Sequence, residues 1–515
     1  MNKQQTQLYT WMKSSLSYVI FAVLAGVIVY FSLMSNDLVN HLDGIWHPSN
    51  FIAGDWEISL GRGLQRYADR ARFGLVSSAW NSVLVFLLLG IADYVVIDRF
   101  QLKHTVYAYL LIFATIANPV VCEAITYSYM SVNFALAYFF AVSAFAVAAG
   151  ELHSVRGNIL QLLCGAVLFG ISMAFYQAYI CVFAVLAGYW LMKELTLKMT
   201  KEVLQRLGYF AGTFLLGGLI YLLITKLLLL RAGIEMASYR GASGISLLSV
   251  IMNLPTSIVT ACKETYRYAV NQNLSMGLEF SSIVITLLLI GMAALFLRHA
   301  IRLFRESVSK GICFVILILL LPLMASIVCV IAVGSSITGL MAMGILMSVL
   351  LAGVLADQHR AETIGTIALL TVLSWYLVST VENDQIALKE GTVATNQIAD
   401  NALAAMSEEG LLTQADCVAF VGRAAENPYF YKSTAYEMAN DYAQFGRWST
   451  DARNNRVTWN GILTTLCGIQ LTFCDDETYT ALIQSETIAE MPCYPAEGYL
   501  EIVDGVLVVK ISELY

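Results

Sequence analysis

Residues 16–34 read LSYVIFAVLAGVIVYFSLM and form the first long apolar stretch of the chain. The stretch contains no charged residue. Roughly 20 apolar residues in a helix cross about 30 Å of hydrocarbon. The apolar core of a secretory signal peptide is usually shorter than this stretch. Residues 16–34 therefore predict a retained membrane span near the N-terminus.

The composition of the whole chain agrees with a membrane protein. Of 515 residues, 58% are hydrophobic and 13% are charged. Soluble domains are about half apolar and about one quarter charged, so a globular fold could not bury this excess. The net charge is −7, and no basic cluster of the kind that binds nucleic acid stands out. We expect a membrane-lipid environment and no nucleic-acid partner.

Apolar stretches of spanning length recur along the first three quarters of the chain. Together they predict a mainly α, polytopic membrane protein with about 11 transmembrane helices. The expected spans are 16–34, 76–97, 104–121, 132–149, 159–175, 178–192, 207–229, 280–297, 311–332, 337–356 and 363–381.

The basic residues predict the orientation of these spans. Lysines and arginines lie near the N-terminus and in the short loops 98–103, 193–206 and 298–310. Cytoplasmic loops carry such an excess, so the N-terminus is expected in the cytoplasm of a multi-pass cytoplasmic-membrane protein. Loops 35–75 and 231–279 are then extracytoplasmic, as is everything after the last span.

The character of the chain changes at residue 382. We expect a membrane domain over 1–381 and a small extracytoplasmic α/β domain over 382–515. Residues 394–406 are predicted to form a helix and residues 417–422 a buried strand. Asp504-Gly505 is a strong hairpin signal between two further strands. Four cysteines in this region leave disulfide formation open: Cys417, Cys467, Cys474 and Cys493.

The first long loop, 36–72, is the richest in titratable groups. Its carboxylates Asp37, Asp43 and Glu57 lie at the expected lipid boundary, where partial burial could raise a pKa and create a general base. The alternative is an ordinary acidic loop in solvent. His41 and His47 could contact a ligand, although loop histidines more often do not.

Residues 57–75 show helical periodicity, with leucines on one stripe and Arg62, Arg66 and Arg70 on the other. This predicts an amphipathic helix lying along the membrane. Its arginines either rest among anionic headgroups or clamp one lipid phosphate, for which the guanidinium is well shaped. Arg240 in the second long loop presents the same two alternatives.

Tyr176, Gln177 and Tyr179 lie where two expected spans meet on the outer side. They could stack on and hydrogen-bond a sugar, or they could belong to the aromatic belt of the interface. No Cys/His spacing predicts a metal site, and no phosphate-binding loop indicates an ATPase. We expect no metal and no cofactor. Few charged residues were found within the expected spans, which disfavours a transporter.

Several short motifs match one pattern in order along the chain. They are Asn40-His41-Leu42-Asp43-Gly44, Gly61-Arg62, Thr126-Tyr127-Ser128-Tyr129-Met130, Tyr176-Gln177-Ala178-Tyr179, Tyr239-Arg240-Gly241, Val418-Ala419-Phe420-Val421-Gly422 and Met491-Pro492-Cys493-Tyr494-Pro495. With these motifs the chain resembles the bacterial GtrII-like membrane glucosyltransferase family, relatives of serotype-converting O-antigen glucosyltransferases, which is grouped with the polytopic GT-C glycosyltransferases.

The resemblance implies an inverting transfer of a hexose, expected to be glucose. The donor would be a polyprenyl (undecaprenyl) phosphate-linked sugar and the acceptor a cell-surface glycan outside the cytoplasmic membrane. Asp43 is the leading base because it stands in the matching motif, with Asp37 and Glu57 as alternatives. The other implied contacts are with the donor phosphate (Arg62, Arg66 and Arg240) and with the sugar or acceptor (His41, Tyr176, Gln177 and Tyr179).

Two other classes of function remain possible at this stage. A transporter or flippase of lipid-linked polysaccharide intermediates would also need many spans, but it would normally contain charged or broken helices at mid-membrane. A non-catalytic scaffold that presents the C-terminal domain would make the first-loop carboxylates dispensable.

Overall fold

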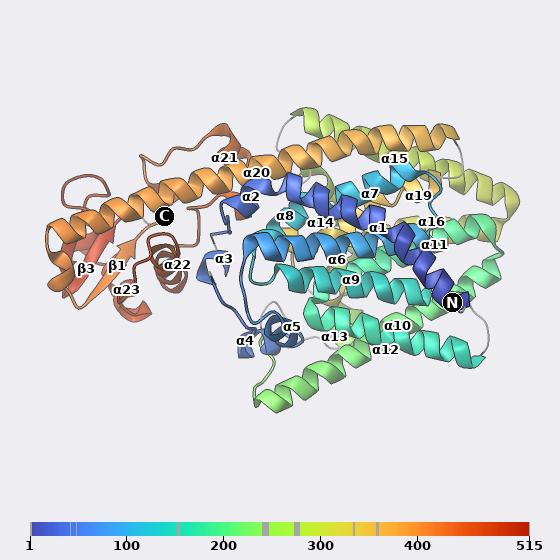
Figure 1. Ribbon diagram of the computed structural model, residues 1–515, viewed down its shortest axis with the longest axis horizontal. Helices are drawn as coiled ribbons and strands as arrows, with labels where there is room; N and C mark the ends of the chain where they lie inside the picture. The colour runs from blue at the N-terminus through green and yellow to red at the C-terminus, as the bar shows by residue number, and fades with distance from the viewer. Residues whose placement is uncertain are drawn as a thin grey trace.

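The computed structural model shows a bundle of long helices that continues at one end into a smaller region with a β-sheet (Figure 1). The residues it describes are 3–41, 43–47, 49–151, 155–238, 247–271, 279–332, 335–356 and 360–513. We call the end of the bundle next to the sheet the sheet-side end, and residues 409–513 the C-terminal region.

Nine helices within the described ranges are long and apolar enough to cross a membrane. They lie in α1 (Lys3–Val29), α6 (Ser78–Arg99), α9 (Ser131–Ala148), α10 (Val155–Phe175), α11 (Ile180–Leu197), α12 (Thr200–Ala232), α15 (Glu279–Glu306), α16 (Val308–Ala325) and α20 (Arg360–Glu408). The mainly α, polytopic architecture expected from the sequence is therefore confirmed.

Two of the expected spans differ from straight helices. Residues 104–121 correspond to α7 (Thr105–Ile116) and α8 (Pro119–Thr126), which meet at 41° and count as a tenth span only when taken together. Residues 337–356 contain α18 (Met343–Leu350) and α19 (Gly353–Ala356), which together are shorter than a span. Apolar length alone did not reveal either interruption.

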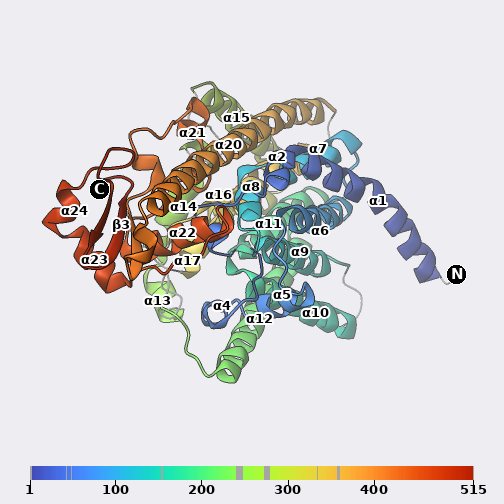
Figure 2. The same cartoon turned by 60° about the vertical axis from the view of Figure 1, so that its left-hand side comes forward.

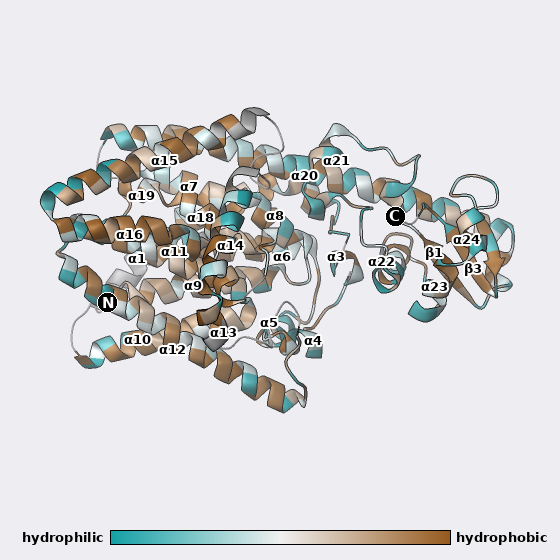
Figure 3. Ribbon diagram, turned by 180° about the vertical axis from the view of Figure 1, so that it is seen from behind, coloured by the Kyte–Doolittle hydropathy of each residue, from teal (hydrophilic) through white to brown (hydrophobic). Residues whose placement is uncertain are grey.

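The helices of the bundle differ in how deeply they are buried. α9 and α11 lie at its centre, where most of their side chains are covered by neighbours. α12 lies at its edge and exposes Leu215, Leu219 and Leu222, and the hydropathy colouring shows the same apolar outer surface on other helices (Figure 3). A helix that is apolar on every side is typical of a membrane span.

α20 connects the bundle to the C-terminal region. Its 49 residues run without a break through the boundary expected at residue 382, over a length of about 73 Å (Figure 1). Near the middle, Gln385 accepts a hydrogen bond from Leu33 N and donates one to Val29 O, both at 2.9 Å. Asp384 accepts bonds from Asn440 and from the Tyr442 hydroxyl. One helix thus holds both parts of the molecule.

The C-terminal region contains a three-stranded sheet of order β1-β3-β2. β1 (Cys417–Val421) pairs in parallel with β3 (Val506–Lys510), which pairs antiparallel with β2 (Leu500–Val503). The β2–β3 turn places Asp504 and Gly505 at φ 50° and 82°, as a two-residue hairpin requires. The expected strand and hairpin are confirmed, and the four cysteines of the region are not disulfide-bonded.

Short helices complete the chain. Those of the first loop are α2 (Phe31–Ser35), α3 (Asp43–Trp46), α4 (Asp55–Ser59) and α5 (Gln65–Ala71). Those beside the bundle are α13 (Leu247–Met252), α14 (Leu254–Tyr266) and α17 (Val328–Ile331). The C-terminal region adds α21 (Thr434–Met438), α22 (Ala452–Thr465), α23 (Asp476–Ile483) and α24 (Glu486–Glu490), and Figure 2 shows α22 facing the sheet-side end.

The single amphipathic helix expected over 57–75 is wrong. The chain forms α4, turns, and then forms α5. Gly61 has φ +76°, a left-handed conformation that an α-helix cannot contain and that favours glycine. Arg62 consequently lies in the turn and not on a helical stripe with Arg66 and Arg70.

Candidate active site

Asp43 begins α3 at the sheet-side end of the bundle, in a segment fixed by its neighbours. Asn40 N donates to Thr126 O at the end of α8, and Asn40 Oδ1 accepts from Gly44 N at 3.1 Å. A Cβ at residue 44 would lie 2.7 Å from Thr126 O, so glycine permits this close approach. The Asp43 side chain is half-buried, and its Oδ2 accepts a 3.3 Å hydrogen bond from the Tyr129 hydroxyl.

The environment of Asp43 changes its acidity. Burial raises the pKa of the Asp43 carboxyl above its usual value, while His47, the Tyr129 hydrogen bond and Arg62 partly offset the rise. A carboxylate whose pKa is raised toward neutrality is better suited to accept a proton. Because Arg62 is among the groups that lower this pKa, its charge acts on Asp43 without a direct contact between them.

Aromatic rings surround this carboxylate. The ring of His47 lies 4.5 Å from that of Phe51 and 4.6 Å from that of Tyr129, and Phe51 and Tyr129 are themselves 4.6 Å apart. These rings limit the access of water to Asp43 and provide flat apolar surfaces beside it. Tyr129 belongs to the motif Thr126–Met130, but the sequence alone does not predict its hydrogen bond to Asp43.

Arg62 lies where the first loop meets the α10–α11 connection, next to α12. Its Nε donates to Gln177 Oε1 at 3.4 Å, and its guanidinium carbon lies 4.8 Å from the centroid of the Tyr176 ring. Gln177 Nε2 in turn reaches Leu60 O at 2.7 Å and the Tyr221 hydroxyl at 2.9 Å. Among the described residues no carboxylate forms a salt bridge with Arg62, which leaves its charge for an anionic ligand.

Gly61 is what allows this arrangement, and its replacement gives a first prediction. A Cβ there would press on the Tyr221 hydroxyl and lie 3.0 Å from Gln177 Nε2, in a left-handed conformation. We expect Gly61→Ala to cost about 1–3 kcal/mol of stability and to weaken donor binding. The thermal unfolding midpoint in detergent measures the first effect.

Gly218→Ala on α12 is the matched control, because nothing lies within 4 Å of a Cβ there. We expect this control to leave the midpoint unchanged or slightly raised. An unchanged midpoint for Gly61→Ala would contradict the close packing of Gly61, Tyr221 and Gln177.

Of three other candidate residues, two are bonded to neighbours in the first loop and one lies outside the site. Arg66 forms a 2.8 Å salt bridge with Asp55, and its Nε donates to Ala53 O at the same distance. Glu57 is buried, and its carboxylate accepts from Gly54 N at 2.7 Å, which caps α4. Asp37 is exposed to solvent on the turn after α2, and no described contact joins it to Asp43.

The remaining candidates are also accounted for. His41 is buried 6.4 Å from the Phe445 ring, and burial together with Arg423 and Arg447 lowers its pKa to about 4, so it is neutral. Tyr179 is buried against Tyr138. Arg240 lies outside the described residues. The structure thus gathers Asp43, Arg62, Tyr176 and Gln177, with Glu57 beside them.

The C-terminal region contacts the segment that carries Asp43. Trp46 Nε1 donates to Thr458 Oγ1 on α22 at 3.1 Å. A Cβ at Gly461, one turn later on α22, would lie 2.7 Å from Ile45 O, so this helix and α3 touch through their backbones. Sequence reasoning missed these contacts because nothing local signals them.

Two buried aspartates, one in the first loop and one in the bundle, were not among the predicted site residues. Asp69 accepts from Ala53 N and from Asn133 Nδ2, and forms a 2.7 Å salt bridge with Arg72. Asp93 on α6 is buried within the bundle and accepts a 2.7 Å bond from the Tyr138 hydroxyl on α9. Asp93 is thus a buried carboxyl within the span expected over 76–97. In the described part of the chain no group of three or more metal-ligating side chains gathers.

A half-buried carboxylate and a cation not paired with a carboxylate lie at one end of a bundle of helices long enough to cross a membrane, and they supply the base and the anion-stabilising group that a membrane-embedded transferase needs. Comparison with known families agrees: the family described as Glucosyl transferase GtrII matches residues 31–350, more than half of the chain. The chain belongs to this family and is a membrane glucosyltransferase. No curated protein and no solved structure matches it.

The matched range includes the motifs around Asp43, Arg62, Tyr129 and Gln177. The two motifs in the C-terminal region lie beyond it. The family relationship therefore covers the residues of the site and the membrane helices that position them.

Proposed function

We propose that the protein transfers glucose from a polyprenyl-phosphate carrier to a cell-surface glycan at the outer face of the cytoplasmic membrane. The observation that carries the proposal is that Asp43 and Arg62 lie at the same end of the bundle, near enough for Arg62 to lower the pKa of Asp43 without forming a salt bridge with it. One is a half-buried carboxylate with a raised pKa, and the other is a guanidinium with no carboxylate partner among the described residues. The carboxylate can take the proton of an incoming hydroxyl, and the guanidinium can stabilise the charge of a sugar phosphate.

The chemical step is a single displacement. The acceptor hydroxyl oxygen attacks the anomeric carbon, its proton passes to an Asp43 carboxylate oxygen, and the bond from the anomeric carbon to the phosphate oxygen breaks. The departing phosphate keeps the electron pair of that bond, and Arg62 stabilises its charge. One displacement at the anomeric carbon inverts its configuration.

The sugar would lie between these two groups. The half-buried rings of His47 and Phe51 offer aromatic faces on which a hexose can stack, and the buried rings of Tyr129 and Tyr176 support His47 and Arg62 respectively. Gln177 holds Arg62 in place and is near enough to share its hydrogen bonds with the ligand. We assign Arg66 and Glu57 supporting roles, because both are engaged with the loop itself.

The membrane location follows from the physical nature of the donor. A polyprenyl chain stays in lipid, so its phosphate is held at headgroup depth. The distribution of Lys and Arg supports an outer location for the first loop and the C-terminal region. A surface glycan would then approach from the aqueous side, beside α22 and α3.

Purified protein in vesicles, supplied with undecaprenyl-phosphate glucose and a surface glycan, tests the proposal. We expect glucose to appear on the glycan with inverted anomeric configuration and undecaprenyl phosphate to accumulate in equal amount. Absence of transfer across a panel of bacterial surface glycans would contradict the donor and acceptor classes proposed.

Transport of lipid-linked intermediates is the alternative that the buried Asp93 could favour, because intramembrane carboxylates often lie on transport pathways. However, Asp93 is bonded to Tyr138 between two packed helices, and the family match supports a transferase. Protein-dependent movement of a fluorescent lipid-linked sugar across vesicles, without glucosyl transfer, would favour transport.

Tyr129→Phe gives a prediction about pH. The Tyr129 hydrogen bond lowers the pKa of Asp43, so its loss leaves the effect of burial less offset and raises that pKa. Because the base acts deprotonated, the rising limb of kcat/KM against pH should move to higher pH. Tyr109→Phe, whose ring stacks on Tyr18 elsewhere, should leave the profile unchanged. A rising limb at unchanged pH would exclude Asp43 as the titrating base.

A further inference from the structure

An apolar cavity of about 410 Å³ lies between α11, α12 and α16. Phe183 and Leu191 of α11 form its inner wall. The flanking walls are apolar side chains of α12 and α16. Four of these side chains are exposed on the outer surface of the bundle: Leu204, Leu207, Ile316 and Leu320. The cavity is therefore a groove that is open to the side.

The groove points toward the candidate active site. Phe210 and Phe214 mark its limit on α12 nearest the sheet-side end, and Tyr221 follows Phe214 by seven residues. Seven residues of α-helix rise about 10 Å and return to within about 20° of the starting direction. Tyr221 therefore continues the line of the groove. Its hydroxyl bonds Gln177, which accepts from Arg62.

This continuity defines the ligand by its chemistry. Toward the sheet-side end is Arg62, which no described carboxylate neutralises. On the other side of Tyr221 lie the aromatic and aliphatic side chains of the groove. A molecule that satisfies both parts has an anionic head and a long apolar tail. The volume accommodates part of such a tail, and the open side lets the remainder lie in the bilayer.

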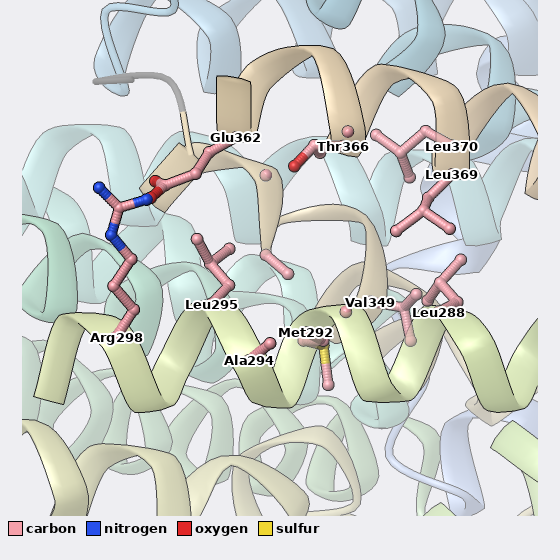
Figure 4. Close-up of a pocket in the computed structure, with 14 residues that line it drawn as sticks. Leu288, Met292, Ala294, Leu295, Arg298, Val349, Glu362, Thr366, Leu369 and Leu370 are labelled. Atoms are coloured by element: carbon pink, nitrogen blue, oxygen red, sulfur yellow. The ribbon is translucent and has the colours of Figure 1, made fainter. Parts of the chain in front are cut away.

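A second apolar cavity, of about 320 Å³, has no arginine that is free of a carboxylate partner among the described residues (Figure 4). It lies between α15 and α20, with Arg298 at one end. That arginine forms a salt bridge with Glu362, which also lies 4.0 Å from His299 Nε2. Its positive charge is already neutralised, so this cavity offers no comparable site for an anionic head.

We propose that the groove between α11, α12 and α16 binds the isoprenoid tail of the lipid-phosphate donor and guides its phosphate to Arg62. The assignment rests on the proposed function for the identity of the donor. It adds a binding site within the membrane whose apolar walls hold the part of the tail nearest the phosphate.

Photo-crosslinking tests the groove without requiring glucosyl transfer. The probe is undecaprenyl phosphate with a diazirine in the isoprenoid chain, added to the full-length protein in phosphatidylcholine vesicles, and the labelled peptides are mapped by mass spectrometry. We expect label on α11, α12 and α16. Unlabelled undecaprenyl phosphate should compete, whereas phosphatidylglycerol, an anionic lipid with two acyl chains in place of the isoprenoid, should not.

Two alanine-to-tryptophan variants make a matched pair. Ala211 lines the groove and Ala294 lines the cavity of Figure 4, and both are exposed, so each position can accept a larger side chain. We expect Ala211→Trp to reduce labelling at least fivefold and Ala294→Trp to leave it unchanged. Leu207→Trp, one turn away from Ala211, is the second groove variant if Ala211→Trp does not fold.

Label on α15 and α20, equal competition by phosphatidylglycerol, or undiminished labelling of folded groove variants would overturn the assignment. If labelling behaves as expected but wild-type protein transfers no glucose, the groove binds the lipid and the proposed reaction is wrong. If wild-type transfer occurs but labelling lies elsewhere, the reaction stands and the groove assignment fails.

Discussion

Asp43→Asn is expected to lower kcat/KM for glucosyl transfer by roughly 10²–10⁴-fold while leaving the fold intact. Asparagine keeps the size of the side chain and can still accept the bond from Tyr129. It cannot take up the proton of the acceptor hydroxyl. The loss should therefore appear mainly in kcat, measured with undecaprenyl-phosphate glucose at saturating donor.

The other two carboxylates of the first loop are the controls. Asp37→Asn changes an exposed side chain and should stay within about threefold of wild type, as ordinary surface substitutions do. Glu57→Gln keeps an oxygen that can accept from Gly54 N. Because Glu57 raises the pKa of Asp43, Glu57→Gln should shift the rising limb of the pH profile to lower pH. A loss at Asp37 equal to that expected at Asp43 would move the base to Asp37.

Arg62→Ala is the second large expected effect, a fall in kcat/KM of roughly 10²–10³-fold. Its guanidinium is held by Gln177 and Tyr176, so it is oriented before the donor arrives. Arg62→Lys keeps the charge but loses the planar pair of donors, and should recover only part of the activity. The comparison should show a rise in donor KM together with a fall in kcat.

Arg66→Ala separates the role of Arg62 from the general charge of the loop. Arg66 is four residues away and already neutralised by Asp55, so its loss should change kcat/KM by less than about tenfold. Equal losses for Arg62→Ala and Arg66→Ala would contradict the assignment of the donor phosphate to Arg62 alone.

The parts of the fold that were predictable are those that short stretches of sequence determine. Apolar length identified the membrane helices, and the Asp504-Gly505 turn identified the hairpin. The break at Gly61 was not predicted, because leucines continue at helical spacing on both sides of it. Only its left-handed backbone, fitted against Tyr221 and Gln177, shows that the helix stops there.

The candidate site was predictable only in part, for a similar reason. Asp37 and Asp43 are six positions apart, and neither composition nor spacing distinguishes them. Burial does, and the burial of Asp43 depends on Tyr129 and on a C-terminal region whose Thr458 is 412 positions from Trp46. His41 stands beside Asp43 in the motif but packs on Phe445, because adjacent residues can face different partners.

The continuity of α20 restricts how the length of the chain can change between the bundle and the C-terminal region. Each residue added to an α-helix turns everything beyond it by about 100° and moves it by about 1.5 Å. An insertion of one residue after Gln385 would thus swing α22 away from α3 and uncover the segment that carries Asp43. The shortest change that returns the angle to within about 20° is seven residues, and it displaces the region by about 10 Å. The number of residues in α20 therefore determines the distance and the orientation of the C-terminal region relative to the segment that carries Asp43.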